Sequence, residues 1–280
     1  MTFDVSHLEI QALVRLALKE DIGSGDITTE LCVRADARAR GRMIARQEMT
    51  LAGIELLPLI FGDCGFRIIH TSGDRLRNGD EIATVTGPAR ALLTGERTAL
   101  NFVQRLSGVA TAANAYAQLM EGTRCRILDT RKTTPGLRRL EKQAAAAGGA
   151  VNHRHGLYDA VLIKNNHITA AGGVRKALEK TRSAAVPVEI EVRTRGELDE
   201  ALACGATHLL LDNLTPDEAR EWITSIRDRK GSAVTVELSG GITLANAKAY
   251  AETGADFLSS GSITHSAPAV DINFGLTLLS

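Results

Sequence analysis

The stretch that decides the fold is Ile127-Leu128-Asp129-Thr130-Arg131-Lys132-Thr133-Thr134-Pro135-Gly136, in which a short apolar run ends in two cations and two hydroxyls. The apolar run is typical of a buried parallel strand. Thr134 and Pro135 suit an N-cap and a first helical position, so we expect a helix from about Leu137. Cations, hydroxyls and the free N–H groups of a helix start then converge at the carboxyl end of a strand, which favours a multiply charged anion. The alternative is an ordinary strand-to-helix turn with solvated cations.

The same pattern recurs after Gly122, where apolar strands end in polar residues just before a turn and a helix. The predicted strand ends are Asp129-Thr130-Arg131-Lys132, Ile163-Lys164-Asn165-Asn166-His167, Ile190-Glu191, Leu211-Asp212-Asn213, Leu238-Ser239-Gly240-Gly241 and Ser259-Ser260-Gly261-Ser262. Beyond the first pair they are spaced by roughly 20 to 30 residues, the length of a βα unit. About six consecutive parallel units favour a closed β/α barrel over an open doubly wound sheet. No GxGxxG follows an early strand, so a dinucleotide crevice is unsupported.

The first part of the chain has a different rhythm. Apolar spacing predicts a helix over Leu8–Leu18, and strand-like alternation follows at Ala39–Glu48, Phe66–His70 and Glu81–Thr86. Helices interleaved with strands in this way indicate a small α+β layer domain.

The boundary between the two parts lies in an almost continuously helical stretch from Pro88 to Met120, with Gly108 as the expected break. We therefore predict an N-terminal α+β domain at 1–107 and a β/α-barrel domain at 108–264. The tail, 265–280, is expected to pack back on the first domain. Helical spacing brings Glu96, Arg97, Asn101 and Arg105 together, which on the residues alone indicates an exposed salt-bridged face.

Composition excludes several classes of protein. The chain has 280 residues with 33 Lys+Arg and 33 Asp+Glu, so no global field favours nucleic acid or a membrane. Aromatic residues make up only 4%, which argues against base-stacking platforms. Four well-separated cysteines, Cys32, Cys64, Cys125 and Cys204, include no CxxC motif, a pattern typical of reduced thiols in a cytosolic protein. With no apolar signal core or membrane helix, we expect a soluble cytoplasmic protein.

A β/α barrel places its site at the carboxyl-terminal rim of the strands, where this sequence concentrates charge. The rim residues are Arg131, Lys132, Lys164, Glu191 and Asp212, joined by His153 and Arg154 from the loop before Lys164. Unpaired charges at the low-dielectric end of a barrel are costly, so a charged ligand should complete them.

The last two predicted units carry similar turns, Ser239-Gly240-Gly241-Ile242-Thr243 and Ser260-Gly261-Ser262-Ile263-Thr264. Glycine lets backbone N–H groups close on an oxyanion, and a helix start favours negative charge. At the last two strands of a barrel this pair predicts phosphate binding.

Three of the rim residues admit alternatives. Glu191 and Asp212 either neutralise the cations or hold Mg²⁺ and sugar hydroxyls, since Mg²⁺ prefers one or two carboxylates with phosphate oxygens and water. Lys164 is interpreted as an anion anchor, with a Schiff-base lysine as the alternative. His153 and His155 have no companions at metal-ligand spacing, so metal ligation by them is not expected.

Several motifs together carry a resemblance to a known family. They are Glu96-Arg97-Thr98-Ala99-Leu100-Asn101, Thr130-Arg131-Lys132-Thr133-Thr134-Pro135-Gly136, Asn152-His153-Arg154, Lys164-Asn165-Asn166-His167, Leu211-Asp212-Asn213 and Ser239-Gly240-Gly241-Ile242. They resemble the motifs of the quinolinate phosphoribosyltransferase, or carboxylating nicotinate-nucleotide pyrophosphorylase, family, and the likeness covers nearly the whole chain. The resemblance implies transfer of phosphoribose from 5-phosphoribosyl 1-diphosphate to quinolinate, with loss of pyrophosphate and CO₂, to give nicotinate mononucleotide for NAD synthesis.

The resemblance also implies roles for residues. Quinolinate would be bound by Arg131, His153, Arg154 and Lys164, with Thr130 and Lys132 nearby. Glu191, with Glu189 as the alternative, and Asp212 would address ribose hydroxyls and Mg²⁺, the one expected cofactor. The loops Ser239, Gly240, Gly241 and Ser260, Gly261, Ser262 would hold the 5-phosphate. Lys132, Lys164, Glu191 and Asp212 form the implied catalytic set, and Arg97 would reach a neighbouring subunit's site, which makes a homodimer the expected assembly.

Three other functions are compatible with the residues. The first is a transferase of the same family that acts on another aromatic acid. The second is a Schiff-base aldolase that uses Lys164. The third is a phosphate-binding module without enzymatic activity.

Overall fold

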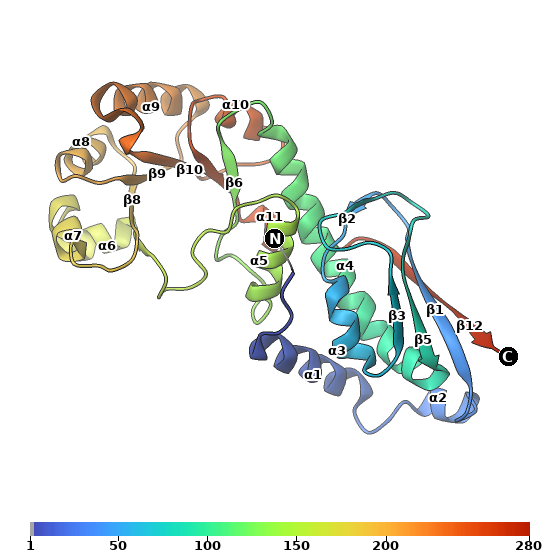
Figure 1. The fold of residues 1–280 in the computed structure, drawn as a ribbon. Coiled ribbons are helices and arrows are strands. Elements are labelled where there is room, and N and C mark those ends of the chain that lie inside the picture. The colour runs from blue at the N-terminus through green and yellow to red at the C-terminus, as the bar shows by residue number, and fades with distance from the viewer. Residues whose placement is uncertain (1–2) are drawn as a thin grey trace. The chain divides into compact units, whose positions relative to one another are not determined.

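The computed structural model describes residues 3–280, which fold into two compact units (Figure 1). The first unit contains the chain up to Asn114 together with Thr134–Gly149 and Ser266–Ser280, and the second contains Ala115–Thr133 and Ala150–His265. Because the two units interleave along the chain, the boundary predicted at 107/108 stays a prediction.

The first unit is built on an antiparallel sheet with the strand order β12-β1-β5-β3. Its strands and helices are α1 Leu8–Ile22, α2 Ile27–Cys32, β1 Arg38–Ala45, β2 Met49–Thr50, the 3₁₀ turn η1 Ile54–Leu56, α3 Leu57–Phe61, β3 Gly65–Ile68, β4 Arg75–Leu76, β5 Glu81–Pro88, α4 Ala89–Leu119 as far as Asn114, α5 Arg138–Ala147 and β12 Ile272–Leu279. Exposed arginines alternate with buried residues along most of β1, the pattern of a sheet with one face in the core. The tail strand β12 pairs with β1 over its full length, from Arg38 opposite Leu279 to Ala45 opposite Ile272.

Helix α4 runs without interruption through Gly108, so the break expected there is absent. A Cβ atom at residue 108 would lie 2.0 Å from the carbonyl oxygen of Pro268. The glycine therefore permits close approach of the tail segment to the helix and does not end the helix.

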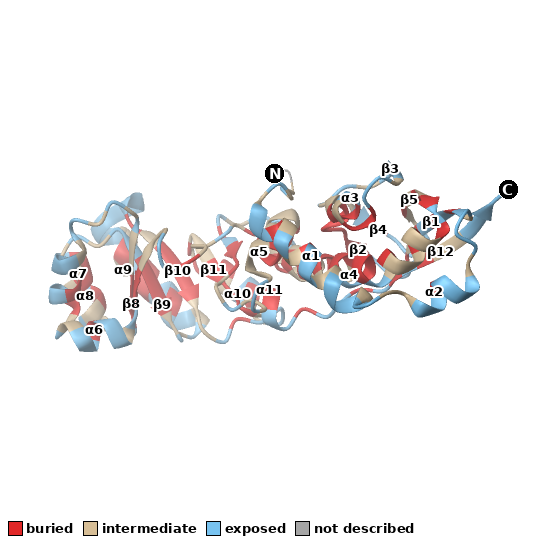
Figure 2. Ribbon diagram, turned by 90° about the horizontal axis from the view of Figure 1, so that it is seen from below, coloured by how far each residue is buried: buried red, intermediate tan, exposed pale blue. Residues whose placement is uncertain are grey.

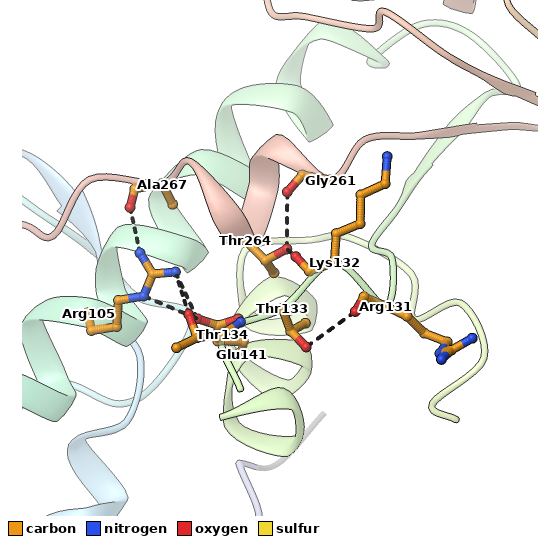
Figure 3. A network of polar contacts seen from close by, with 9 residues as sticks. All are labelled: Arg105, Arg131, Lys132, Thr133, Thr134, Glu141, Gly261, Thr264 and Ala267. Atoms are coloured by element: carbon orange, nitrogen blue, oxygen red, sulfur yellow. Dashed lines mark hydrogen bonds and ion pairs between the residues drawn. The ribbon is translucent and has the colours of Figure 1, made fainter. Parts of the chain in front are cut away.

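A buried ion pair within the first unit joins α4 to α5 (Figure 3). The Nη2 atom of Arg105 lies 2.8 Å from Oε1 of Glu141, whose side chain is 0% exposed. Thr134 donates its backbone N–H to Glu141 at 3.0 Å and its hydroxyl at 2.7 Å, and Arg105 donates to the carbonyl of Ala267 at 2.6 Å. Arg105 is therefore not on the exposed face that helical spacing predicted. The helix expected from about Leu137 is confirmed as α5, but its N-cap is Leu137, and Thr134, the predicted cap, binds the Glu141 carboxylate.

The second unit is a six-stranded parallel sheet with the order β6-β11-β10-β9-β8-β7. Its elements are β6 Arg126–Leu128, β7 Val161–Ile163, α6 Asn165–Ala171, α7 Val174–Thr181, β8 Val188–Val192, α8 Arg195–Ala203, β9 His208–Asp212, α9 Pro216–Lys230, the 3₁₀ turn η2 Gly231–Ala233, β10 Thr235–Ser239, α10 Ala247–Ala251, β11 Phe257–Ser259 and α11 Ser262–His265. Figure 2 shows buried residues concentrated on the strands and exposed ones on the outer sides of the helices.

The predicted fold class is confirmed in this unit, since all six strands and the helices that follow β8, β9 and β10 are present. The closed barrel that was also predicted is not formed by the strand pairing of the described residues. Within residues 3–280, β6 and β7 do not pair with each other, and the free side of β6 carries a single parallel bridge from Leu128 to Val151. The hydrogen-bonded ladder of the parallel sheet therefore stays open between its two edge strands, β6 and β7.

Candidate active site

A pocket of about 130 Å³ lies at the carboxyl ends of the parallel strands in the second unit. Seven predicted site residues line it: Thr130, Arg131, Lys132, His153, Arg154, Lys164 and Ser239. Four further lining residues were not predicted: Leu162, Leu210, Glu237 and Ser259. The pocket is well below the roughly 300 Å³ at which sites for drug-sized ligands begin, so it suits one small molecule or part of a larger one.

Positive charge dominates this pocket. Its lining contains the permanent cations Arg131, Lys132, Arg154 and Lys164 but one carboxylate, Glu237. Within residues 3–280 neither Lys132 nor Lys164 has an ion-pair partner. Burial and then the charge of Arg131 lower the pKa of Arg154, which shows that the cations repel one another. An anion with more than one charge would relieve this repulsion.

Asp129 at the end of β6 positions the loop that carries two of the pocket residues. Its carboxylate is fully buried and accepts the Asn152 side-chain amide at 2.6 Å and the backbone N–H of His153 at 2.8 Å. Asp129 stood inside the quoted motif but was not predicted as a site residue. The sequence feature that could have identified Asp129 is a single acidic residue at the end of an apolar strand.

The imidazole of His153 lies between two carboxylates. Its Nε2 atom is 3.2 Å from Oε2 of Glu189 on β8 and 3.3 Å from Oε2 of Glu237 on β10. Its Nδ1 atom accepts the backbone N–H of Arg154 at 2.7 Å. Both ring nitrogens are therefore engaged by the protein, and the expectation that His153 lacks companions of metal-ligand type is wrong, because folding brings two acids to it.

This cluster holds more protons than its residues would carry in water. Burial opposes the charge on His153, but Glu189 and Glu237 outweigh it and raise the pKa of the ring to about 10. Burial and then Glu237 raise the pKa of Glu189. The backbone N–H of Arg154 points at Nδ1, so the geometry places the ring N–H at Nε2, between the two carboxylates, and the additional proton is shared by the ring and the carboxylate pair.

Glu191 and Asp212 form a second acidic pair, on β8 and β9. The Nη2 atom of Arg193 lies 2.8 Å from Oε1 of Glu191 and 2.9 Å from Oδ2 of Asp212. Glu191 Oε1 is buried and has no partner at hydrogen-bond geometry. Arg193 was not predicted as a site residue, and its position directly after a strand end was the signal for it.

The two glycine-containing loops follow β10 and β11. Gly240 has φ +93°, and a Cβ atom there would lie 2.2 Å from the side-chain oxygen of Asn213, so only glycine fits. The hydroxyl of Ser260 donates to the carbonyl of Ile242 at 3.0 Å, while that of Ser262 lies 2.8 Å from the Tyr116 hydroxyl. These loops are therefore held by contacts inside the second unit.

The backbone of Lys132 is fixed while its side chain remains free (Figure 3). The hydroxyl of Thr264 donates to the Lys132 carbonyl at 2.8 Å and to the carbonyl of Gly261 at 3.1 Å. Figure 3 shows the Lys132 amine at the end of an extended side chain, away from these contacts. Lys164 is also exposed, which removes the burial expected of a Schiff-base lysine.

Arg97 is the one predicted site residue in the first unit. It is exposed on α4, and within residues 3–280 it has no hydrogen bond or ion pair. The salt-bridged face expected from helical spacing is therefore absent at Arg97.

Comparisons with known proteins agree along the length of the chain. The family models described as quinolinate phosphoribosyl transferase, N-terminal domain, and quinolinate phosphoribosyl transferase, C-terminal domain, match residues 26–107 and 109–275. A probable nicotinate-nucleotide pyrophosphorylase [carboxylating] of Bacillus subtilis is 40% identical over 98% of this chain and 96% of the relative. The nicotinate-nucleotide pyrophosphorylase [carboxylating] of Mycobacterium leprae is 43% identical over 94% and 95%. The structure of the Francisella tularensis nicotinate-nucleotide pyrophosphorylase superposes with a TM-score of 0.92 at 36% identity, covering 98% of both chains.

Proposed function

We infer that this chain, which belongs to the quinolinate phosphoribosyltransferase family, transfers phosphoribose from 5-phosphoribosyl 1-diphosphate to the nitrogen of quinolinate. Pyrophosphate leaves, and loss of CO₂ then gives nicotinate mononucleotide, a precursor in NAD synthesis. The observation that carries this function is the excess of cations in the 130 Å³ pocket. Quinolinate is a small aromatic dianion, and its donor brings a phosphate and a pyrophosphate.

Arg131, Arg154 and Lys164 are proposed to bind the quinolinate carboxylates. Arginine binds a carboxylate through two parallel N–H donors, which fixes the plane of the ring as well as its position. Thr130 and Lys132 lie beside them in the lining. His153 is proposed to act mainly by shaping the floor of the pocket, because both of its nitrogens already have protein partners.

Glu191 and Asp212 are proposed to bind the ribose hydroxyls and Mg²⁺ of the donor. The residues fit the ion: they supply two carboxylates from adjacent strands, and one buried oxygen of Glu191 has no hydrogen-bond partner. Bound there, Mg²⁺ would stabilise negative charge on the departing pyrophosphate. The proposal places the 5-phosphate against Ser239, Gly240 and Gly241 and against Ser260, Gly261 and Ser262.

Catalysis in this proposal comes from position and charge, without a protein nucleophile. The cations orient quinolinate so that its ring nitrogen faces the ribose carbon. The carboxylates of Glu191 and Asp212 favour the positive charge that develops on the sugar as the leaving group departs. Once ribosylated, the ring nitrogen is cationic and accepts the electron pair released when the adjacent carboxylate leaves as CO₂.

A homodimer is proposed as the active assembly, with Arg97 reaching the pocket of the partner subunit. The support is the exposed position of Arg97, which makes no hydrogen bond or ion pair within residues 3–280.

A cytoplasmic location is proposed because all four cysteines are free thiols. Within residues 3–280 no helix combines the length and the apolar character that crossing a bilayer requires.

The function is tested by incubating the chain with quinolinate, the phosphoribosyl donor and Mg²⁺ and following nicotinate mononucleotide. Product that requires all three components supports the proposal. Product with a different aromatic acid but none with quinolinate would identify a related transferase. Covalent trapping of Lys164 by borohydride with a carbonyl substrate would identify an aldolase, and binding without turnover would identify a phosphate-binding module.

A further inference from the structure

Arg193 contacts both residues of the acidic pair, Glu191 and Asp212, but the proposed reaction gives it no role. One guanidinium nitrogen, Nη2, contacts both carboxylates, at 2.8 Å to Glu191 and 2.9 Å to Asp212. A single positive atom between two carboxylate oxygens occupies the position that a bound cation would take. The same Oδ2 atom of Asp212 also accepts the side-chain amide of Asn213 at 2.8 Å, which fixes the position of the carboxylate.

The backbone and the side chain of Arg193 are held very differently. Its backbone N–H donates at 2.7 Å to Glu197, the residue that forms a capping box with Thr194 at the start of helix α8. Its side chain is 45% exposed, whereas the side chains of Glu191 and Asp212 are 6% and 12% exposed. The guanidinium can therefore rotate away from the acids into solvent without any movement of the loop.

The contact with Glu191 is close but poorly directed. Glu191 Oε1 has no partner at hydrogen-bond geometry, although Nη2 of Arg193 is 2.8 Å away. The attraction there is mostly that of opposite charges, without the directed bonds that arginine forms when it grips a carboxylate with two donors. A contact of this kind neutralises the acids and is readily exchanged for another cation.

We propose that Arg193 is a built-in counter-cation that occupies the acidic pair while the site is empty and that a divalent cation displaces. This inference rests on the proposed placement of Mg²⁺ at Glu191 and Asp212. Without a metal ion, the guanidinium screens the buried carboxylate of Glu191 and the half-buried carboxylate of Asp212 from each other. When the ion arrives with the donor, the guanidinium leaves the acids and becomes available to a phosphate oxygen of the same donor.

Exchange of this kind makes metal binding depend on the donor. A divalent ion alone must compete with Arg193 for the two acids. The apparent affinity of the protein for the ion is therefore the intrinsic affinity multiplied by the fraction of time for which the acids are free of Arg193. If the guanidinium occupies them for about 80–90% of the time, the affinity of the substrate-free protein is lowered about five- to tenfold. A donor that attracts the released guanidinium offsets this loss.

The test is titration of the substrate-free protein with Mn²⁺, followed by the electron paramagnetic resonance signal of the free ion. Arg193→Ala is expected to bind Mn²⁺ about five- to tenfold more tightly than the unaltered chain, and Arg193→Gln to behave in the same way. Arg195→Ala is the matched control. Arg195 lies two residues away, over the ring of Trp222 at 4.8 Å and paired with Glu221, so its loss should leave Mn²⁺ affinity unchanged.

Equal or weaker Mn²⁺ binding by both Arg193 variants would overturn the proposal, and so would tighter binding by the Arg195 variant to the same extent. Asp212→Asn locates the ion: the tighter binding of Arg193→Ala should disappear in the double variant, and its persistence would also overturn the proposal. Turnover of quinolinate by the unaltered chain is measured separately. If Mn²⁺ does not displace Arg193 but the unaltered chain still converts quinolinate, the exchange is wrong and the proposed reaction is not affected.

Discussion

Two charged regions of the molecule, one in each unit, are built on opposite principles. In the first unit, Arg105 and Glu141 satisfy each other, and Thr134 completes the carboxylate (Figure 3). At the rim of the second unit, Lys132 and Lys164 have no ion-pair partner within residues 3–280. A charge matched inside the chain stabilises the fold, whereas a charge left unmatched at a strand end is available to a ligand.

Breaking the matched pair should produce the largest effect on stability. Glu141→Leu leaves the guanidinium of Arg105 largely buried without its carboxylate, which should lower the free energy of unfolding by about 3–5 kcal/mol. Urea denaturation measures the loss. The double variant Arg105→Met, Glu141→Leu should recover part of it, since removing both charges removes the unpaired one. A double variant as unstable as the sum of the two single variants would show that the pair is not one electrostatic unit.

Lys164→Ala tests the unmatched side of the comparison. Losing one preorganised cation at a site of developing charge should lower kcat/KM about a hundred- to a thousandfold, equivalent to about 2.7–4 kcal/mol. The melting temperature should stay the same or rise, because removing an unpaired cation relieves repulsion. Calorimetric melting and steady-state turnover are measured on the same preparation. A variant that unfolds would place Lys164 among the structural charges.

Arg97→Ala should have a smaller effect on turnover. In the proposed dimer, loss of a charge-assisted contact to a quinolinate carboxylate costs about 1.5–3 kcal/mol. An exposed arginine without that role would cost under about 1 kcal/mol. Mixed Arg97→Ala and Lys164→Ala subunits should regain activity, because one site of each heterodimer keeps both residues. If subunits that demonstrably exchange regain none, Arg97 does not act across the interface.

The His153 cluster should give an effect on stability that depends on pH. Its pKa is raised from 6.5 to about 10 in the folded chain, so the stability that the proton contributes is full below pH 6.5 and is lost as pH rises towards 10. Between pH 7 and 9 the loss should approach about 1.4 kcal/mol for each pH unit. His153→Asn should flatten the curve in urea denaturation at several pH values. Parallel curves for the two proteins would mean that the folded cluster binds no additional proton.

The sequence predicted the strands of the second unit well because a parallel sheet leaves a strong local signal. Each strand is an apolar run ended by a polar residue, and the strand ends at Lys164, Asp212 and Ser239 lie where expected. The open edge between β6 and β7 could not be predicted, because it depends on pairing between strands that are distant in the chain.

Errors were concentrated where a residue contacts another segment of the chain. Thr134 looked like a cap, but Glu141 takes both its backbone N–H and its hydroxyl. Gly108 looked like a helix break, but it allows the approach of Pro268. Glu189 and Glu237 lie 48 residues apart in the sequence and meet only because β8 and β10 both face the interior of the second unit. Local periodicity has no information about such contacts.

Calorimetric titration with quinolinate alone tests most directly the claim that the cations lining the rim pocket bind it. Binding to the unaltered chain should be exothermic and should weaken as salt increases. Arg131→Ala should lower the affinity about tenfold or more, while Asp212→Asn, which alters the proposed donor side of the site, and Arg195→Ala, outside it, should leave the affinity within about twofold of the unaltered chain. Arg131→Ala binding as tightly as the unaltered chain, or an equal loss in Asp212→Asn, would contradict the account.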